Sequence, residues 1–147
     1  MTTSTHHEQQ IQKLSELIAD LHCGMLTTVD QNNHLHSCPM YRSGDINSQR
    51  AIWFFTSAHT QKAEDIKRNH QVNVSFTSPD QERYISVSGT AELIQDRNQM
   101  QQQWQPEIQT WLPKGLEEPD LVLIKVNINK IDYWDSPSTI HPQTSQF

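Results

Sequence analysis

The segment of residues 82–94 most constrains the fold, because apolar and polar side chains alternate along its whole length. Its apolar positions are Ile85, Val87, Ala91 and Leu93. Alternation with a period of two places these side chains on one face, which predicts a long, half-buried antiparallel strand. Gly89 interrupts the pattern, and a glycine inside a strand indicates a β-bulge or the close approach of a second backbone. A long bent strand of this kind favours a β-barrel.

The rest of the chain predicts shorter elements around this strand. Five further strands are expected over residues 25–29, 34–41, 51–56, 72–76 and 121–134, and clusters of turn-forming residues separate the earlier ones. Apolar residues at three- and four-residue spacing predict helices over residues 8–22 and 60–69. A Gln-rich helix is expected over residues 96–111, with a break at Pro106. About six strands with short connections indicate an α+β fold, a six-stranded antiparallel barrel with flanking helices.

A length of 147 residues predicts one domain. We expect it to span residues 8–137, between a disordered tail at residues 1–7 and a loose tail at residues 138–147. The longest apolar runs fall far short of the roughly 20 residues that cross a bilayer, and no charged-then-apolar leader opens the chain. These features predict a cytoplasmic protein without a membrane partner.

The charge and the glycine content exclude several functional classes. A net charge of −6 argues against a nucleic-acid partner, because such surfaces depend on many Lys and Arg residues. The four glycines form neither a dinucleotide-binding nor a P-loop motif. A reducing compartment would keep Cys23 and Cys38 as free thiols.

An anion site is one interpretation of the residues that follow the strand at 51–56. Thr56, Ser57, Thr60 and Lys62 place three hydroxyls and an ammonium where a helix begins. A helix N-terminus also offers unpaired N–H groups, so these residues could hold a phosphate. The alternative is structural: Thr60 caps the helix and Lys62 is a solvated surface charge.

Two other kinds of site have weaker support. His34, His36 and Cys38 alternate on one predicted strand and therefore share a face, as a metal tripod would require. However, they lie in a row and no fourth ligand is apparent, so no metal is predicted. A hydrolytic triad cannot be inferred from one chain, because its members meet in space and not at fixed spacing.

Four tryptophans can either fill a core or form the wall of a site for a planar ligand. They are Trp53, Trp104, Trp111 and Trp134. Trp53 belongs to a continuous apolar run and is expected in the core. Trp134 ends a strand and is followed directly by a loop, which makes it the better candidate for a ligand contact.

Four segments together resemble a known family. They are His36-Ser37-Cys38-Pro39-Met40; Trp53-Phe54-Phe55-Thr56-Ser57 with Lys62; Arg83-Tyr84-Ile85-Ser86-Val87-Ser88-Gly89-Thr90-Ala91; and Tyr133-Trp134-Asp135-Ser136-Pro137. In order and spacing, this set resembles the pyridoxamine 5'-phosphate oxidase-like flavoproteins, and within them the general stress protein branch of FMN-binding split barrels. The resemblance implies a homodimeric split barrel with two FMN sites at the dimer interface.

The resemblance also implies the residues that contact the cofactor. Flavin phosphate would bind at Phe55, Thr56, Ser57, Thr60, Gln61 and Lys62. The flavin ring would lie along Ser37, Cys38, Pro39 and Met40, and Tyr84 and Trp134 would contact it from either the same or the second subunit. Gln61 and Cys38 stand where arginine is common in the family, which implies weaker phosphate binding. The expected cofactor is FMN, with FAD as the second choice.

The substrate-binding signature of the true oxidase, Arg-Leu-His-Asp-Arg, is missing from residues 136–142. The resemblance therefore implies a flavin-dependent oxidoreductase without vitamin B6 oxidase activity, acting with an unknown small-molecule electron donor or acceptor. No catalytic residue is predicted. The alternatives are a non-catalytic protein that binds or sequesters flavin, and an interaction module with an empty pocket.

Overall fold

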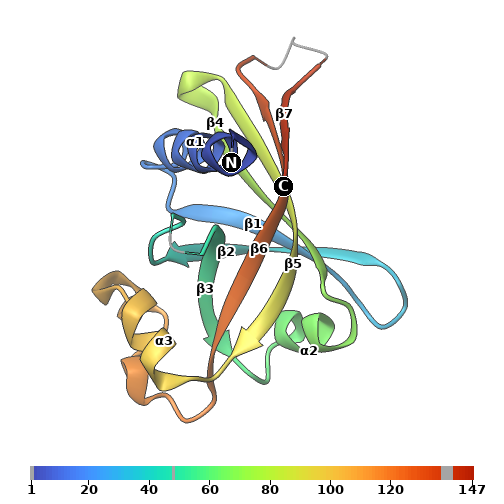
Figure 1. Ribbon diagram of the computed structural model, residues 1–147. Helices are drawn as coiled ribbons and strands as arrows, with labels where there is room; N and C mark the ends of the chain where they lie inside the picture. The colour runs from blue at the N-terminus through green and yellow to red at the C-terminus, as the bar shows by residue number, and fades with distance from the viewer. Residues whose placement is uncertain (1, 48, 137–140) are drawn as a thin grey trace.

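A computed structural model describes residues 2–47, 49–136 and 141–147, which form one antiparallel β-barrel with helices around it (Figure 1). The strands are β1 (Cys23–Val29), β2 (Leu35–Ser43), β3 (Ala51–Ser57), β4 (Gln71–Ser78), β5 (Arg83–Ile94), β6 (Leu121–Trp134) and β7 (Gln143–Gln146). The helices are α1 (Thr2–Leu17), α2 (Gln61–Arg68) and α3 (Arg97–Gln103), with 3-10 turns η1 (Pro79–Gln81), η2 (Pro106–Thr110) and η3 (Gly115–Glu117).

The sheet closes because β3 pairs with β6 as well as with β2. The strand order is β3-β2-β1-β4-β5-β6-β7. Strands β1 to β6 form the barrel, and the short β7 pairs with β6 outside it. This confirms the predicted six-stranded antiparallel barrel with flanking helices. Within the described ranges, no helix has the length and apolar character needed to cross a membrane.

The long strand predicted over residues 82–94 is β5, and its bend lies at Gly89. The pairing of β5 with β6 shifts between Ser88 and Gly89, which is the predicted bulge. A Cβ atom on Gly89 would lie 2.2 Å from the carbonyl oxygen of Asn127, so the two backbones approach too closely for any other residue. The glycine therefore allows the tight β5–β6 contact that closes the barrel.

Replacing Gly89 with alanine should destabilise the fold by roughly 1 to 3 kcal/mol, because the added methyl group has to displace the β6 backbone. Urea unfolding would measure this loss. Thr90→Ala is the matched control, since it shortens a half-buried side chain at the next position of the same strand. Equal stability of Gly89→Ala and wild type would contradict the close backbone contact.

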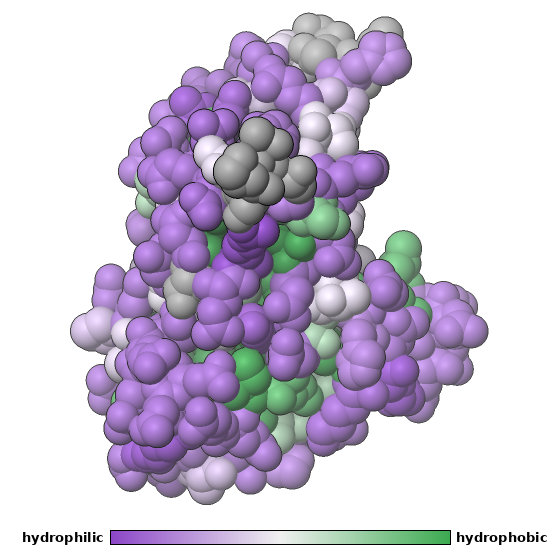
Figure 2. Space-filling view, viewed as in Figure 1, coloured by the Kyte–Doolittle hydropathy of each residue, from purple (hydrophilic) through white to green (hydrophobic). Residues whose placement is uncertain are grey.

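Strand β3 is buried on both faces, which explains its continuous apolar sequence. Ile52 and Phe54 belong to the core inside the barrel, together with residues of α1 and α2. Trp53 and Phe55 point the other way, into a second cluster with Met100, Ile108, Leu121 and Leu123. Trp53 is fully buried, as predicted. Figure 2 shows apolar atoms over β3 and β6 beside α3, surrounded by hydrophilic surface.

The N-terminal helix is longer at its start and shorter at its end than the sequence predicted. α1 begins at Thr2, inside the predicted tail of residues 1–7, and ends at Leu17 instead of residue 22. The start is held by tertiary contacts, including a ring contact of 4.8 Å between His7 and Phe147. The end is fixed by Arg42, whose guanidinium donates to the carbonyls of Ile18 and Leu21.

The C-terminal segment also differs from the predicted loose tail. Residues 143–146 form β7, which pairs with β6 over Lys130–Tyr133. Phe147 packs against the barrel core and its N–H donates to the carbonyl of Asn129 at 2.8 Å. The polar sequence gave no strand signal here, because the backbone pairing with β6 and the single terminal ring provide the order. Residues 137–140 lie outside the described part of the chain.

The helix predicted over residues 96–111 is divided. α3 ends at Gln103, and after Trp104 and Gln105 the chain continues as the 3-10 turn η2. Pro106 begins η2, in agreement with the predicted break. Residues 97–117 thereby form a folded connection that covers the outer face of β3.

Candidate functional site

A cavity of about 450 Å³ lies between β2, β3, the start of α2 and the segment after η2. This volume falls in the range of roughly 300 to 1,000 Å³ that small-molecule sites occupy. The residues that line it are Cys23, Pro39, Met40, Tyr41, Phe55, Thr56, Ser57, Thr60, Lys62, Ile108, Trp111 and Leu112. Most of the residues predicted to contact flavin meet here, although they come from three separate elements.

One end of the cavity carries the polar groups. The last residues of β3 and the first turn of α2 bring together the hydroxyls of Thr56, Ser57 and Thr60 and the ammonium of Lys62. The N–H groups of Gln61 and Lys62 lie in the first turn of α2, where a helix has no internal acceptor for them. Lys62 is the only charged side chain among the lining residues.

The hydroxyls are held in place by bonds within the loop. Thr60 caps α2, as the structural alternative predicted, because its Oγ1 accepts from the N–H of Ala63 at 3.4 Å. The same hydroxyl donates to the carbonyl of Ser57 at 2.9 Å and accepts from Thr56 at 3.4 Å. Capping and lining of the cavity are therefore compatible. Lys62 is half-buried and borders the cavity, so it is not simply a solvated surface charge.

Strand β2 contributes to the cavity with only part of its predicted segment. Pro39 and Met40 line the cavity, whereas Ser37 is exposed on the outer face and shares a hydrogen bond of 2.6 Å with Thr27. Cys38 points inward and packs against the barrel core. Burial raises the pKa of the Cys38 thiol, and Lys62 partly opposes this effect. The thiol is therefore protonated at neutral pH.

Three other predicted contacts lie outside the cavity. Gln61 is exposed on α2. Tyr84 and Trp134 pair with each other where β5 begins and β6 ends, whereas the cavity residue Phe55 pairs with Leu123, near the start of β6. At about 3.3 Å per residue, the stretch of β6 from Leu123 to Trp134 spans roughly 36 Å. Tyr84 and Trp134 do not line the cavity of their own chain.

Five lining residues were not predicted from the sequence. They are Cys23, Tyr41, Ile108, Trp111 and Leu112. Tyr41 directly follows the predicted segment of β2, so extending that segment by one residue would have included it. Ile108, Trp111 and Leu112 come from the connection between α3 and β6, and only tertiary folding brings this connection to the cavity. The one available signal was that Trp111 is a tryptophan, a residue that can form the wall of a site for a planar ligand.

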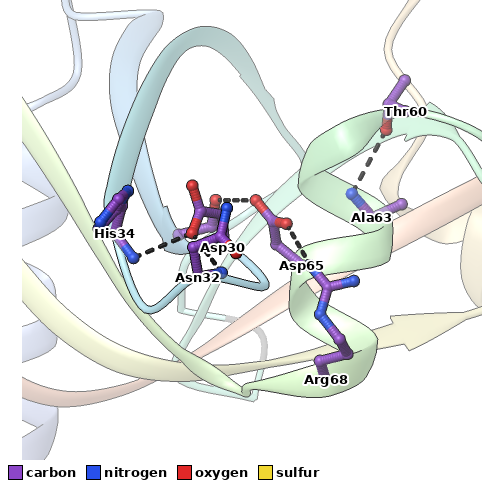
Figure 3. Close-up of polar contacts among 8 residues, drawn as sticks. Asp30, Asn32, His34, Thr60, Ala63, Asp65 and Arg68 are labelled. Atoms are coloured by element: carbon purple, nitrogen blue, oxygen red, sulfur yellow. Dashed lines mark hydrogen bonds and ion pairs between the residues drawn. The ribbon is translucent and has the colours of Figure 1, made fainter.

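A buried carboxylate fixes α2 against the β1–β2 hairpin (Figure 3). Asp65 is 1% exposed, and it accepts from the hydroxyl of buried Thr28 at 2.9 Å. Its other oxygen accepts from the guanidinium of Arg68 at 2.8 Å. These contacts hold α2, which carries Lys62, next to β1.

The turn of that hairpin should make stability depend on pH. Asp30 accepts from the backbone N–H groups of His34 and Asn32, each at 2.9 Å. The His34 bond is the largest cause that holds the pKa of Asp30 below its ordinary value of 3.8. A lowered pKa means that this stabilisation is complete above about pH 3.8 and is lost as the pH falls through the folded-state pKa.

We therefore expect Asp30→Asn to lower the urea midpoint most at neutral pH, with a difference from wild type that narrows below pH 3.8. Unfolding curves at pH 7 and pH 3 would measure this change. A difference that is the same at both pH values would show that the charge of Asp30 is not involved.

Two other features were compared with the cavity. An open groove of about 1,070 Å³ runs beside α1, but its lining mixes charges of both signs, among them Glu8, Lys13, Glu16, Arg50 and Arg83. It lacks the combination of hydroxyls, one ammonium and apolar walls. No group of three or more His, Cys, Asp or Glu side chains that could hold a metal occurs in the described ranges. His34 and His36 are exposed, whereas Cys38 faces the core.

Comparison with known proteins agrees with the resemblance noted in the sequence. Residues 9–144 match the family described as pyridoxamine 5'-phosphate oxidase like. General stress protein 26 from Bacillus anthracis is 27% identical, with a TM-score of 0.75 over 97% of this chain and 99% of that protein. A Clostridium acetobutylicum protein related to general stress protein 26 is 20% identical, with a TM-score of 0.79 over 95% of this chain and 96% of that one.

A third similar structure is the general stress FMN/FAD binding protein from Xanthomonas citri. It is 22% identical, with a TM-score of 0.73 over 90% of this chain and 93% of that protein. The family match extends from α1 into β7 and therefore includes the whole barrel. The chain thus belongs to the pyridoxamine 5'-phosphate oxidase-like family, and its similarity to general stress protein 26 structures confirms the resemblance seen in its sequence.

Proposed function

We propose that this protein binds FMN in the cavity between β2, β3 and α2 and is a flavin-dependent oxidoreductase without vitamin B6 oxidase activity. The observation that carries the proposal is the combination of one ammonium and three hydroxyls at one end of a cavity with otherwise largely apolar walls. This combination suits a molecule with a phosphate at one end and an aromatic ring system at the other. The name of the similar Xanthomonas citri protein supports a flavin as that molecule.

In this proposal each part of the cavity has one task. Thr56, Ser57, Thr60 and Lys62 bind the phosphate, together with the first N–H groups of α2. The Pro39–Met40 segment of β2 lies along the ring, where its backbone can bond to the polar edge. The bound flavin supplies hydride or electron transfer to or from a small molecule. The Arg-Leu-His-Asp-Arg signature is absent from residues 136–142, which argues against pyridoxal phosphate as that molecule.

We also propose that the working unit is a homodimer. Tyr84 and Trp134 pair with each other at one end of β5 and β6 and do not line the cavity of their own chain. The partner subunit's Tyr84 and the partner subunit's Trp134 would complete the site if the far end of one barrel packs beside the cavity of the other. Light scattering during size-exclusion chromatography should give about twice the monomer mass of 17.1 kDa. A monomer that retains flavin would show that the second subunit is not needed for binding.

The absorption spectrum of the purified protein tests the cofactor directly. It should show the two visible bands of oxidised flavin after FMN is added and unbound FMN is removed by desalting. Chromatography of the released cofactor then distinguishes FMN from FAD. A protein that stays colourless after this treatment would leave the family fold without the flavin function and would favour an interaction module.

A non-catalytic flavin-binding or flavin-sequestering protein is the second candidate. It is favoured because the lining within the described part of this chain includes no carboxylate or imidazole, and such groups are the usual acids and bases in catalysis. Adding NADH, NADPH or a photoreduced deazaflavin to the loaded protein separates the two candidates. Bleaching of the flavin bands, followed by reoxidation in repeated cycles, supports the oxidoreductase. Bands that no reductant bleaches support storage or sequestration.

A further inference from the structure

Aromatic rings form a short stack at the side of the cavity away from the sheet core. Tyr41 of β2 lies 4.8 Å from Trp111 between ring centroids, at an interplanar angle of 34°. Tyr41 also stacks on His22 at 5.7 Å and 17°. Tyr41 and Trp111 both line the cavity. We refer to His22, Tyr41 and Trp111 as the aromatic stack.

Trp111 keeps much of its surface exposed although it borders an apolar cavity. It is 57% exposed, whereas Trp53 is completely buried. Ile108 and Leu112 also line the cavity. An indole ring in this position gains from contact with another planar ring, because the contact removes apolar surface from water and adds a favourable ring-to-ring interaction. The geometry therefore provides a binding surface for an aromatic ligand.

The charges of the cavity limit which ligand can use this surface. Lys62 is the only charged side chain that lines the cavity, and it lies with the hydroxyls at the α2 end. A flavin phosphate bound there would use this ammonium. A second anion would then meet no further cation among the described residues of this chain that line the cavity. The stack is thus suited to an uncharged ring.

We propose that the aromatic stack binds a planar, uncharged aromatic ring of the second substrate, and that Trp111 selects for the planar ring. The inference rests on the proposed function, because it requires the flavin phosphate to occupy the Lys62 end. It goes beyond that function by naming the substrate class and a residue that selects it. Trp111 would discriminate by contact area and not by charge.

The test uses the FMN-loaded protein with two probes of the same ring system, 2-naphthol and 2-naphthalenesulfonate. Equilibrium dialysis measures the binding of each, and flavin absorbance in the same samples measures how much FMN is retained. Wild type should bind 2-naphthol more tightly than the sulfonate. Trp111→Ala should weaken 2-naphthol binding roughly 2- to 12-fold, the range of one aromatic contact. Trp111→Phe should keep most of the affinity.

Leu35→Ala is the matched control, because Leu35 is 75% exposed and does not line the cavity. It should bind both probes as wild type does. Binding of 2-naphthol that is equal in wild type and Trp111→Ala would overturn the role of Trp111. Equal or tighter binding of the sulfonate would overturn the specificity for uncharged rings.

Two further outcomes separate this inference from the proposed function. Release of FMN when 2-naphthol binds would show that the stack holds the flavin ring itself, which overturns the inference and leaves flavin binding intact. Failure of wild type to retain FMN would contradict the proposed function. In that case the same dialysis is carried out on the flavin-free protein. Binding of 2-naphthol that is lost in Trp111→Ala supports the aromatic stack, whereas binding that does not depend on Trp111 overturns it.

Discussion

Replacing Lys62 with alanine should weaken FMN binding roughly ten- to 150-fold, because a lost charged contact costs about 1.5 to 3 kcal/mol. Among the described residues that line the cavity, Lys62 alone carries a charge, so no other described lining residue can substitute for it. The family resemblance implies arginine at two positions that carry Gln61 and Cys38 here. Titration of apo-protein with FMN, monitored through the quenching of flavin fluorescence, would measure the change in affinity.

Two variants make this experiment specific. Lys62→Arg keeps the positive charge and should retain most of the affinity. Lys67→Ala removes a charge from the same helix, but Lys67 is exposed and pairs with Glu64 at 3.5 Å, so FMN binding should not change. Equal affinity of Lys62→Ala and wild type would place the phosphate elsewhere. Loss of affinity in Lys67→Ala as well would indicate a general charge effect and not a contact.

Replacing Asp65 with alanine should destabilise the protein by about 2 to 4 kcal/mol. The carboxylate is 1% exposed, and its removal leaves the hydroxyl of Thr28, also 1% exposed, without its partner. An unsatisfied buried polar group costs about 1 to 3 kcal/mol. Loss of the Arg68 ion pair adds less, because the Arg68 side chain is 44% exposed and is screened by water. For a domain of this length, the melting temperature should fall by roughly 4 to 16 °C.

Thermal unfolding followed by circular dichroism would measure this effect. Asp65→Asn retains an acceptor for Thr28 and should lose less stability than Asp65→Ala. Glu64→Ala is the surface control, because Glu64 is 49% exposed and its ion pair with Lys67 contributes at most about 1 kcal/mol. If Asp65→Ala and Glu64→Ala have the same melting temperature, the buried carboxylate does not fix α2 to the β1–β2 hairpin.

Local sequence patterns were sufficient for the barrel strands. The alternation over residues 82–94 became β5, and the predicted bulge is at Gly89. The apolar run at residues 51–56 became β3, whose burial on both faces explains why its pattern does not alternate. Such patterns are reliable because each strand buries the side chains that its own sequence supplies.

Elements that depend on distant contacts were less predictable. The early start of α1 depends on contacts of His7 with Arg50 and with Phe147. Strand β7 depends on its pairing with β6. Polar sequences such as residues 143–146 contain no alternation of apolar and polar residues that would predict a strand. Their structure comes from backbone bonds to a neighbour that the local sequence does not encode.

For the candidate site, the sequence by itself determined the composition of one end. The hydroxyls of Thr56, Ser57 and Thr60 and the ammonium of Lys62 follow one another within a single strand-to-helix turn, so local folding brings them together. The family resemblance added Pro39 and Met40, which also line the cavity. The resemblance also assigned Tyr84 and Trp134 to the same site. These two residues lie where β5 begins and β6 ends, outside the cavity lining.

Only the tertiary structure decided the rest of the cavity. The pairing of β2 with β3 sets the two strands side by side, and the connection from α3 to β6 brings Ile108, Trp111 and Leu112 to the same cavity as Tyr41. The physical reason is that apolar side chains pack without a directional code, so residues far apart in the chain become neighbours only when the common core forms.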